Sequence, residues 1–272
     1  YGYNDRSEVT SAIRKTSGNT EITPLNAAYS YDGIGNRLTS SSGVLGDHTY
    51  TPNGLNQYSS IASTDTRTAV GRAPSSWNVL VAGVAASRID EVFYRPLTAS
   101  NAASPVWQDV VIQRDTGSPT TTQHFWYAPQ SVSPTHDFDG NLTNDGRWVY
   151  SWDAENRLVQ MESTTQATAA GHPYTKLQFA YDWQGRRIAR HVWQGGTQAT
   201  PTFKSSHRWL YDGWNAITEF TAPSAVSTTL ARVNTFTWGL DLSGSLQDAD
   251  GVGGLLAQTT VSGGITERAS YD

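Results

Sequence analysis

The chain has no cysteine and only one methionine among its 272 residues. It therefore has no disulfides and no thiolate chemistry. Hydrophobic residues make up 37% and charged residues 16% of the chain, below the roughly 45–50% and 25% of an average globular domain. This shortage favours a sheet with a polar face in solvent over a compact globule with a deep core.

Basic runs and long apolar runs are also missing. With a net charge of −5 and no cluster of lysine or arginine, we expect no nucleic acid and no anionic membrane as primary partner. We expect no membrane span, because no segment approaches the roughly 20 apolar residues that a helix needs to cross a bilayer. The first residues do not form a signal peptide, so an exported parent protein would carry its signal upstream.

Aromatic residues are abundant, with 10 tryptophans and 13 tyrosines. Each of them buries about 150–250 Å² when it packs, which compensates for the missing aliphatic residues. Alanine, leucine, glutamate and lysine never recur with a helical period, whereas β-branched, aromatic and turn residues do. We predict an all-β fold.

The aromatic residues belong to a repeated pattern. Each copy has two aromatics separated by one residue, then Asp or Asn, a turn, and Arg-Leu or its equivalent. The clear copies are residues 29–38, 150–158 and 179–188, a weaker copy is 1–9, and degenerate copies are 48–58, 137–142 and 209–217. Residues two apart lie on the same face of a strand, so each copy predicts a β-hairpin with an aromatic stripe.

The acids of the pattern have a structural explanation. Asp and Asn bond backbone amides two residues ahead, which closes a strand into a turn. Gly35, Gly185 and Asn156 are suited to the positive φ that a tight reversal needs. The copies suggest loops that differ by one residue, which indicates a bulge within the turn. Self-similarity over tens of residues predicts a repeat architecture.

These units resemble RHS repeats, also called YD repeats. The run from Trp238 to Gln247, followed by residues 251–257, resembles the segment that leads into the conserved core of that family. The resemblance covers residues 1–61 and 131–272. It implies a spiralling sheet that forms a partial shell or barrel around a C-terminal toxin or effector domain of the same polypeptide, in a bacterial protein that is secreted or displayed at the cell surface. In the family, downstream aspartates of the core release the cargo by self-cleavage. The core would lie beyond this chain, so we assign no catalytic residue.

The repeats are interrupted between residues 62 and 130. Strand-like alternation continues there, with Ser, Asn, Pro and Gly turns between the strands. We predict three parts: repeats at 1–61, an inserted β-module resembling a small sandwich at 62–130, and repeats leading toward the core at 131–272. Tyr271 and Asp272 open another unit, so we interpret the chain as an excerpt from a longer polypeptide.

Metal and catalytic motifs are weak. The loops at Asp137 and at Asp248 alternate acids like calcium loops but lack the bidentate Glu at the twelfth position. The six histidines lack the spacing of zinc ligands, and no nucleophile elbow, phosphate loop or dinucleotide motif is present. We therefore predict no cofactor, no metal and no enzymatic activity.

The main hypothesis is a non-catalytic structural section of an RHS-type shell that encloses a toxin. The alternative is an adhesive module that binds a cell-surface glycan or receptor, with the 62–130 insert as contact surface. Four tryptophans are candidates for stacking on sugar rings: Trp107, Trp126, Trp183 and Trp214. Packing between strands explains residues of the aromatic stripes better. For Trp183 and Trp214, which lie off the stripes, packing and sugar binding both stay open.

Overall fold

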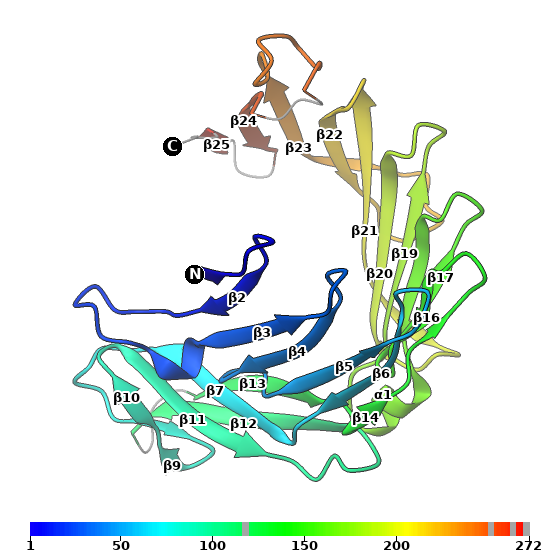
Figure 1. The fold of residues 1–272 in the computed structure, drawn as a ribbon. Helices are drawn as coiled ribbons and strands as arrows, with labels where there is room; N and C mark the ends of the chain where they lie inside the picture. Colours follow the sequence, from blue (N-terminus) through cyan, green and yellow to red (C-terminus); the bar gives the residue numbers. More distant parts are fainter. Residues whose placement is uncertain (116–119, 250–252, 262–264, 269–272) are drawn as a thin grey trace. The chain divides into compact units, whose positions relative to one another are not determined.

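The computed structural model describes residues 1–115, 120–249, 253–261 and 265–268 (Figure 1). Its regular structure is almost entirely antiparallel β, which confirms the predicted all-β class. The described residues contain only two short helical segments, η1 (Thr23–Leu25) and α1 (Thr165–Ala169), and no helix among them is long and apolar enough to cross a membrane. The predicted final unit at Tyr271 and Asp272, and Asp250 of the second acidic loop, lie outside the described residues.

The chain divides into two compact units. Unit 1 comprises Tyr1–Val149 with Thr164–His172, and unit 2 comprises Tyr150–Ser163 with Pro173–Asp272. The two units are defined by where contacts within the chain are dense, whereas the three parts expected from the sequence are defined by the repeat pattern. The three-part division therefore stays a prediction.

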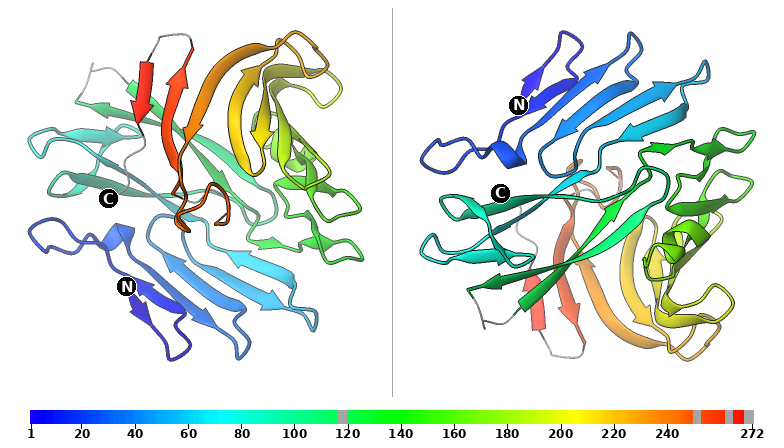
Figure 2. Two further views of the ribbon diagram at one scale, coloured as in Figure 1. Left: turned by 90° about the horizontal axis from the view of Figure 1, so that it is seen from above. Right: turned by 90° about the horizontal axis from the view of Figure 1, so that it is seen from below.

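Unit 1 begins with a seven-stranded antiparallel sheet in the order β1-β2-β3-β4-β5-β6-β14. Its first six strands form three successive hairpins, which lie side by side with their turns at one edge (Figure 2). The strands are β1 (Gly2–Tyr3), β2 (Val9–Ala12), β3 (Ala27–Tyr31), β4 (Arg37–Ser42), β5 (His48–Pro52), β6 (Tyr58–Ser63) and β14 (Ser131–Val132).

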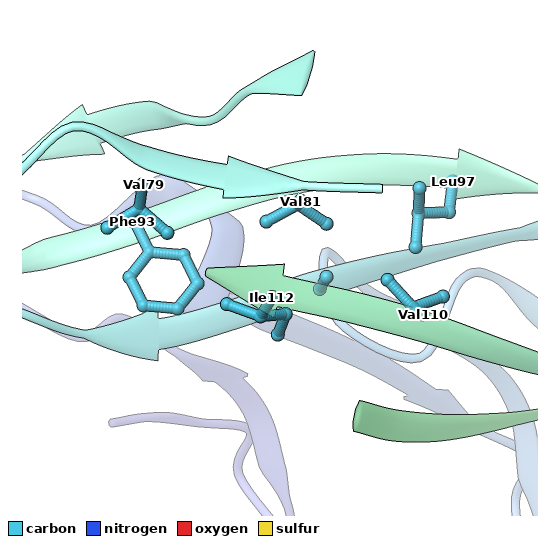
Figure 3. Packing of buried hydrophobic residues seen from close by; sticks show 7 residues of the cluster. Val79, Val81, Phe93, Leu97, Val110 and Ile112 are labelled. Atoms are coloured by element: carbon cyan, nitrogen blue, oxygen red, sulfur yellow. The ribbon is translucent and has the colours of Figure 1, made fainter. Parts of the chain in front are cut away.

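The residues between β6 and β14 form two further sheets, of orders β10-β11-β7 and β13-β12-β8-β9. A single apolar cluster with side chains from both sheets joins them (Figure 3). The cluster contains Ala69, Val79, Val81, Phe93, Leu97, Val110 and Ile112. The strands are β7 (Thr66–Arg72), β8 (Val79–Val81), β9 (Val84–Ala85), β10 (Ser87–Ile89), β11 (Val92–Thr98), β12 (Val106–Arg114) and β13 (Thr120–Tyr127).

The two ends of this segment meet at its base. Strand β14 pairs with β6, so the chain returns to the sheet beside the strand that it left. The backbone N–H of Ser63 donates to the carbonyl of Gln130 at 2.9 Å. Asn101 is completely buried there, and its Nδ2 donates to the carbonyl of Ala128 at 2.6 Å. The chain therefore leaves this sheet after β6 and returns to it at β14, directly beside β6.

The remaining strands follow one another in sequence order, from β15 to β25, in an antiparallel sheet. Unit 1 holds β15, β16 and the start of β17, and unit 2 holds β18 to β25. The strands are β15 (Thr135–His136), β16 (Leu142–Asn144), β17 (Trp148–Trp152), β18 (Leu158–Ser163), β19 (Thr175–Tyr181), β20 (Arg187–Gly196), β21 (Pro201–Asp212), β22 (Asn215–Thr221), β23 (Ala231–Trp238), β24 (Leu255–Thr260) and β25 (Ile265–Arg268).

Candidate functional site

The repeats share one turn, which is built from five residues. In every copy except that of residues 209–217, and also at Asp241, the backbone N–H of the first residue, the closing residue, donates to the carbonyl of the fifth at 2.7–3.0 Å. The fourth residue always has a positive φ, between 60° and 97°. This is a type I turn followed by a left-handed residue, the usual three-residue hairpin loop with a bulge. The closing residues are Asn4, Asp32, Asn53, Asp137, Asp153, Asp182 and Asp241.

The side chain of the closing residue explains why Asp or Asn stands there. In the Asp182 turn, one carboxylate oxygen accepts from the backbone N–H of Gln184 at 2.9 Å and of Arg186 at 3.0 Å. Asn4 and Asn53 accept the same two bonds through their amide oxygens. The backbone N–H groups of the third and fifth turn residues would otherwise be unpaired at the end of the hairpin. The side chain of the closing residue therefore fixes the conformation of the loop.

The loop has the same length in the clear copies, 29–38, 150–158 and 179–188, so the one-residue variation suggested between them is wrong. The copies differ in the position of the arginine, which is the fifth residue of some turns and the residue after it in others. This difference changes the spacing of the sequence motif but not the backbone of the turn. The bulge itself is present, since the strand register shifts between Ser30 and Tyr31 and between Ala180 and Tyr181.

The bonds to the closing acids also lower their pKa values. The hydrogen bond from the backbone N–H of Arg157 is the largest influence on Asp153, and it lowers the pKa of that carboxyl. For Asp182, desolvation raises the pKa, but hydrogen bonds from the side chain and backbone of Arg186 outweigh it and the net shift is downward. These acids are held as anions that accept hydrogen bonds, which is unsuitable for a general acid.

Arginine side chains connect three of the turns to the turn that follows. The guanidinium of Arg157 donates to the carbonyl of Asp182 at 3.2 Å, and that of Arg186 donates to the carbonyl of Gly213. In unit 1, Arg6 donates in the same way to the carbonyl of Gly33. The same arginines lie over aromatic rings of the next hairpin in unit 2, at 5.2 Å for Arg157 over Tyr181 and 5.1 Å for Arg186 over Tyr211.

The second aromatic of the pattern makes a connection in the opposite direction. Its polar end donates to a backbone carbonyl of the preceding hairpin, at the first or second residue of the returning strand. These bonds run from the hydroxyl of Tyr31 to Val9 at 2.9 Å, of Tyr181 to Leu158 at 3.0 Å and of Tyr211 to Arg187 at 3.0 Å, and from the indole Nε1 of Trp238 to Ala216 at 2.7 Å. Every such pair lies within a single unit.

The hairpin at Asp212 departs from the common turn. Its strands pair directly at Asp212 and Asn215, which leaves a two-residue loop with Gly213 at φ 54°. Glycine at the first central position permits this tighter turn. Gln247 takes the connecting role, because its Nε2 donates to the carbonyl of Asp212 at 2.9 Å and its Oε1 accepts from the N–H of Trp214 at 2.8 Å.

Two of the four candidate tryptophans lie on turns of unit 2. Trp183 is the second residue of the Asp182 turn, and its side chain is 85% exposed. Trp214 is in the two-residue loop of the next hairpin and is 49% exposed. Arg186 bonds one turn to the other, so the two loops are neighbours. Their role in binding a sugar stays a prediction.

The other two candidates lie in unit 1, opposite each other on β12 and β13. The ring of the buried His172 meets Trp107 and Trp126 edge-on, with centroids 4.8 Å and 6.0 Å away, and also meets Trp148 at 5.2 Å. The guanidinium of Arg147 lies over the same three indoles and is 3.0 Å from the imidazole Nε2. The structure thus brings Trp107 and Trp126 together within a packed aromatic and cationic cluster.

Sequence reasoning missed the turn at Asp241 and this cluster. Asp241 carries the signal of the other copies, an acid with glycine three residues later, but its aromatic pair, Phe236 and Trp238, is separated from it by Gly239 and Leu240. The cluster has no local signal, because its members come from four distant segments. Among the described residues, no three His, Asp or Glu side chains gather closely enough to hold a metal ion.

No protein-family model and no curated protein matches this chain. Similar solved structures include a chain of the Photorhabdus luminescens Tc holotoxin pore, at 13% identity, and a chain of the TcdB2-TccC3-TEV crystal structure, at 14% identity. The matches cover 94% and 95% of this chain but only 14% of each of those chains. The TM-score is 0.25 in both cases, which is too low to carry an argument about function.

Proposed function

We propose that this chain is a structural section of an RHS-type shell, which encloses a C-terminal cargo domain of the same polypeptide and performs no catalytic step itself. The observation that supports this role is the uniform turn and its connections. Three hairpins, with turns at Asn4, Asp153 and Asp182, donate to the turn of the next hairpin through an arginine and receive a bond back from its aromatic residue. Such a sheet extends by adding identical units, each stabilised by its neighbours.

The acids fit a passive role. The closing aspartates accept bonds from the backbone of their own turns, so the most regular carboxylates of the chain already have structural partners. Enclosure would act by exclusion, because a cargo that is kept away from solvent and from its target is inactive. The bacterial, secreted or surface-displayed setting and the toxin partner belong to the same proposal, through the sequence resemblance.

The test uses the parent polypeptide with the residues that follow Asp272. We expect the downstream domain to resist limited proteolysis in the intact parent. The double variant Asp153→Ala and Asp182→Ala should expose it, while the double Asp→Asn variant, which keeps the acceptor oxygen, should protect it. Equal cleavage of the downstream domain in parent and Ala variant would overturn the proposal, as would a stop codon directly after Asp272.

A further inference from the structure

The two sheets between β7 and β13 leave a cleft of about 580 Å³ between them. This volume lies within the roughly 300–1,000 Å³ of typical small-molecule sites. The cleft is lined by strands of both sheets, with Val79, Phe93 and Ile112 of the apolar cluster as its floor. All of its lining residues belong to unit 1.

The strands change from apolar to polar where they reach the cleft. Along β12, alternate residues share one face, and the buried Val110 and Ile112 are followed on that face by Arg114. Along β13, the face of Phe125 continues with Gln123 and Thr121, which also line the cleft. A sandwich built for stability alone would continue these faces with apolar residues.

Trp77 stands at the cleft on a short loop, with 40% of its surface exposed. Arg114 lies over its ring, 4.8 Å from the centroid. The loop is fixed by Arg88, whose guanidinium donates to the carbonyls of Ala73 at 2.7 Å, Pro74 at 2.9 Å and Trp77 at 3.0 Å. A charged side chain that donates to three backbone carbonyls of the loop holds the indole in one position before any ligand arrives.

The charges of the cleft have one sign. Arg114 is the charged side chain that strand alternation directs into it, whereas Arg72 follows Gly71, which faces Phe93, and so lies on the other face of β7. No acid lines the cleft among the described residues, although Asp115 contacts Arg114 from outside the lining at 3.4 Å. The carboxamide of Gln123 adds a donor and an acceptor. The planar fork of an arginine selects a carboxylate, an exposed indole selects a ring with an apolar face, and a carboxamide selects hydroxyls.

We propose that this cleft binds a carboxylated sugar ring. The ring stacks on Trp77, its carboxylate pairs with Arg114, and its hydroxyls bond Thr121 and Gln123 of β13. Arg88 is a positioning residue, which acts through the Trp77 loop. The site is separate from Trp107, Trp126, Trp183 and Trp214, and it stands independently of the enclosing role, since a shell section needs no ligand.

The proposal is tested on the full 272-residue chain with three probes in NMR titrations at constant ionic strength. D-Glucuronate carries both the ring hydroxyls and the carboxylate, D-glucose carries only the hydroxyls, and cyclohexanecarboxylate carries only the carboxylate. We expect glucuronate to bind with a Kd on the order of 1 mM, as its size allows, and about tenfold more tightly than either other probe.

Variants separate the roles. Arg114→Gln should weaken glucuronate about tenfold, to the level of glucose, and leave glucose unchanged. Trp77→Ala should abolish binding of both sugars. Arg88→Lys should weaken both sugars by the same factor, because it loosens the loop without changing the charge. Arg232→Gln, at an exposed arginine of β23, is the matched control and should change nothing.

Circular dichroism and thermal melting confirm that each variant is folded before binding is compared. Absence of glucuronate binding by the folded wild-type chain would overturn the proposal. So would equal affinity for all three probes, or binding that is lost in Trp183→Ala but kept in Trp77→Ala.

Discussion

The repeat hairpins and the segment between β7 and β13 are stabilised in different ways. The segment has a core of its own, in which Val81 and Val110 are 0% and 1% exposed. The repeats have few fully buried side chains, and every residue of β17 and of β19 is at least partly exposed. They rely on side-chain bonds to the backbone of the adjacent hairpin. The stability of a repeat therefore comes from contacts with neighbouring hairpins, whereas the stability of the segment comes from its own apolar core.

This difference also separates the chemistry of the two regions. In the repeats, the polar side chains are used for turns and connections, which leaves little for a ligand. In the segment, the apolar core carries the stability, so Arg114 and Gln123 at its open end are available for binding. We expect substitutions to have local effects in the repeats and cooperative effects in the segment.

The largest loss of stability is expected from Val110→Ala. Removing two methyl groups from a fully packed site should lower the free energy of unfolding of the segment by about 2–3 kcal/mol. Val111 is the matched control, because it is the next residue of the same strand but is 42% exposed. Urea denaturation measures both variants. Equal losses for Val110→Ala and Val111→Ala would show that the apolar cluster is not what holds the segment.

The next largest effect is expected from His172→Ala. His172 is 6% exposed between three indoles, so its removal should cost about 2 kcal/mol. His124 is the control: it stacks on Trp107 at 5.3 Å, but 51% of its side chain is exposed. His124→Ala should cost less than about 0.5 kcal/mol. A larger loss for His124 than for His172 in urea denaturation would contradict the role of the cluster.

Acid should unfold the repeats before the segment. The pKa values of Asp32, Asp137, Asp153 and Asp182 are lowered in the folded chain from the usual 3.8. The unfolded chain thus takes up protons first as the pH falls. The stabilisation by these groups is complete above about pH 4 and is lost as the pH falls through the lowered folded values.

Replacing these four aspartates by asparagine keeps the acceptor oxygen, as Asn4 and Asn53 show, but removes the titration. The variant should retain its hydrogen-exchange protection in the repeats at lower pH than the wild type. An unchanged acid midpoint would mean that other groups govern acid unfolding.

A single closing acid has a smaller, local effect. Asp182→Ala removes the acceptor for the backbone N–H groups of Gln184 and Arg186, and their hydrogen exchange should become about tenfold faster or more. Asp182→Asn should keep most of the protection. Exchange that is equally fast in both variants would show that the charge, not the acceptor geometry, closes the turn.

The sequence predicted the features that local chemistry decides. The positive φ at Gly35, Gly185 and Asn156 and the bonds to the closing acids follow from residue types within one turn. The tight loop after Asp212 was not predicted, because Gly213 competes with the longer turn and the outcome depends on Gln247, 35 residues from Asp212. Contacts between residues far apart in the chain decide which of the two loops forms, and no repeated pattern in the sequence indicates such contacts.

The candidate sites show the same limit. The four tryptophans proposed from the sequence were chosen by residue type, but exposure and partners separate them into two turn residues and two cluster residues. Trp77 was indistinguishable in the sequence, because its position depends on Arg88 and Arg114 from other strands. Residue type alone predicted that tryptophans are candidates for stacking on a sugar ring. Only the tertiary structure shows which tryptophan faces a cleft.

The smallest expected effect is the loss of one connection between hairpins. The hydroxyl of Tyr31 donates to the carbonyl of Val9 at 2.9 Å, so Tyr31→Phe should cost about 1 kcal/mol in urea denaturation. Tyr29 is on the same strand and is also half-buried, and among the described residues its hydroxyl has no hydrogen-bond partner. Tyr29→Phe should therefore be close to neutral, since its ring still contacts Arg37. If Tyr31→Phe were equally neutral, the bonds between hairpins would not explain how repeats without a core of their own stay folded.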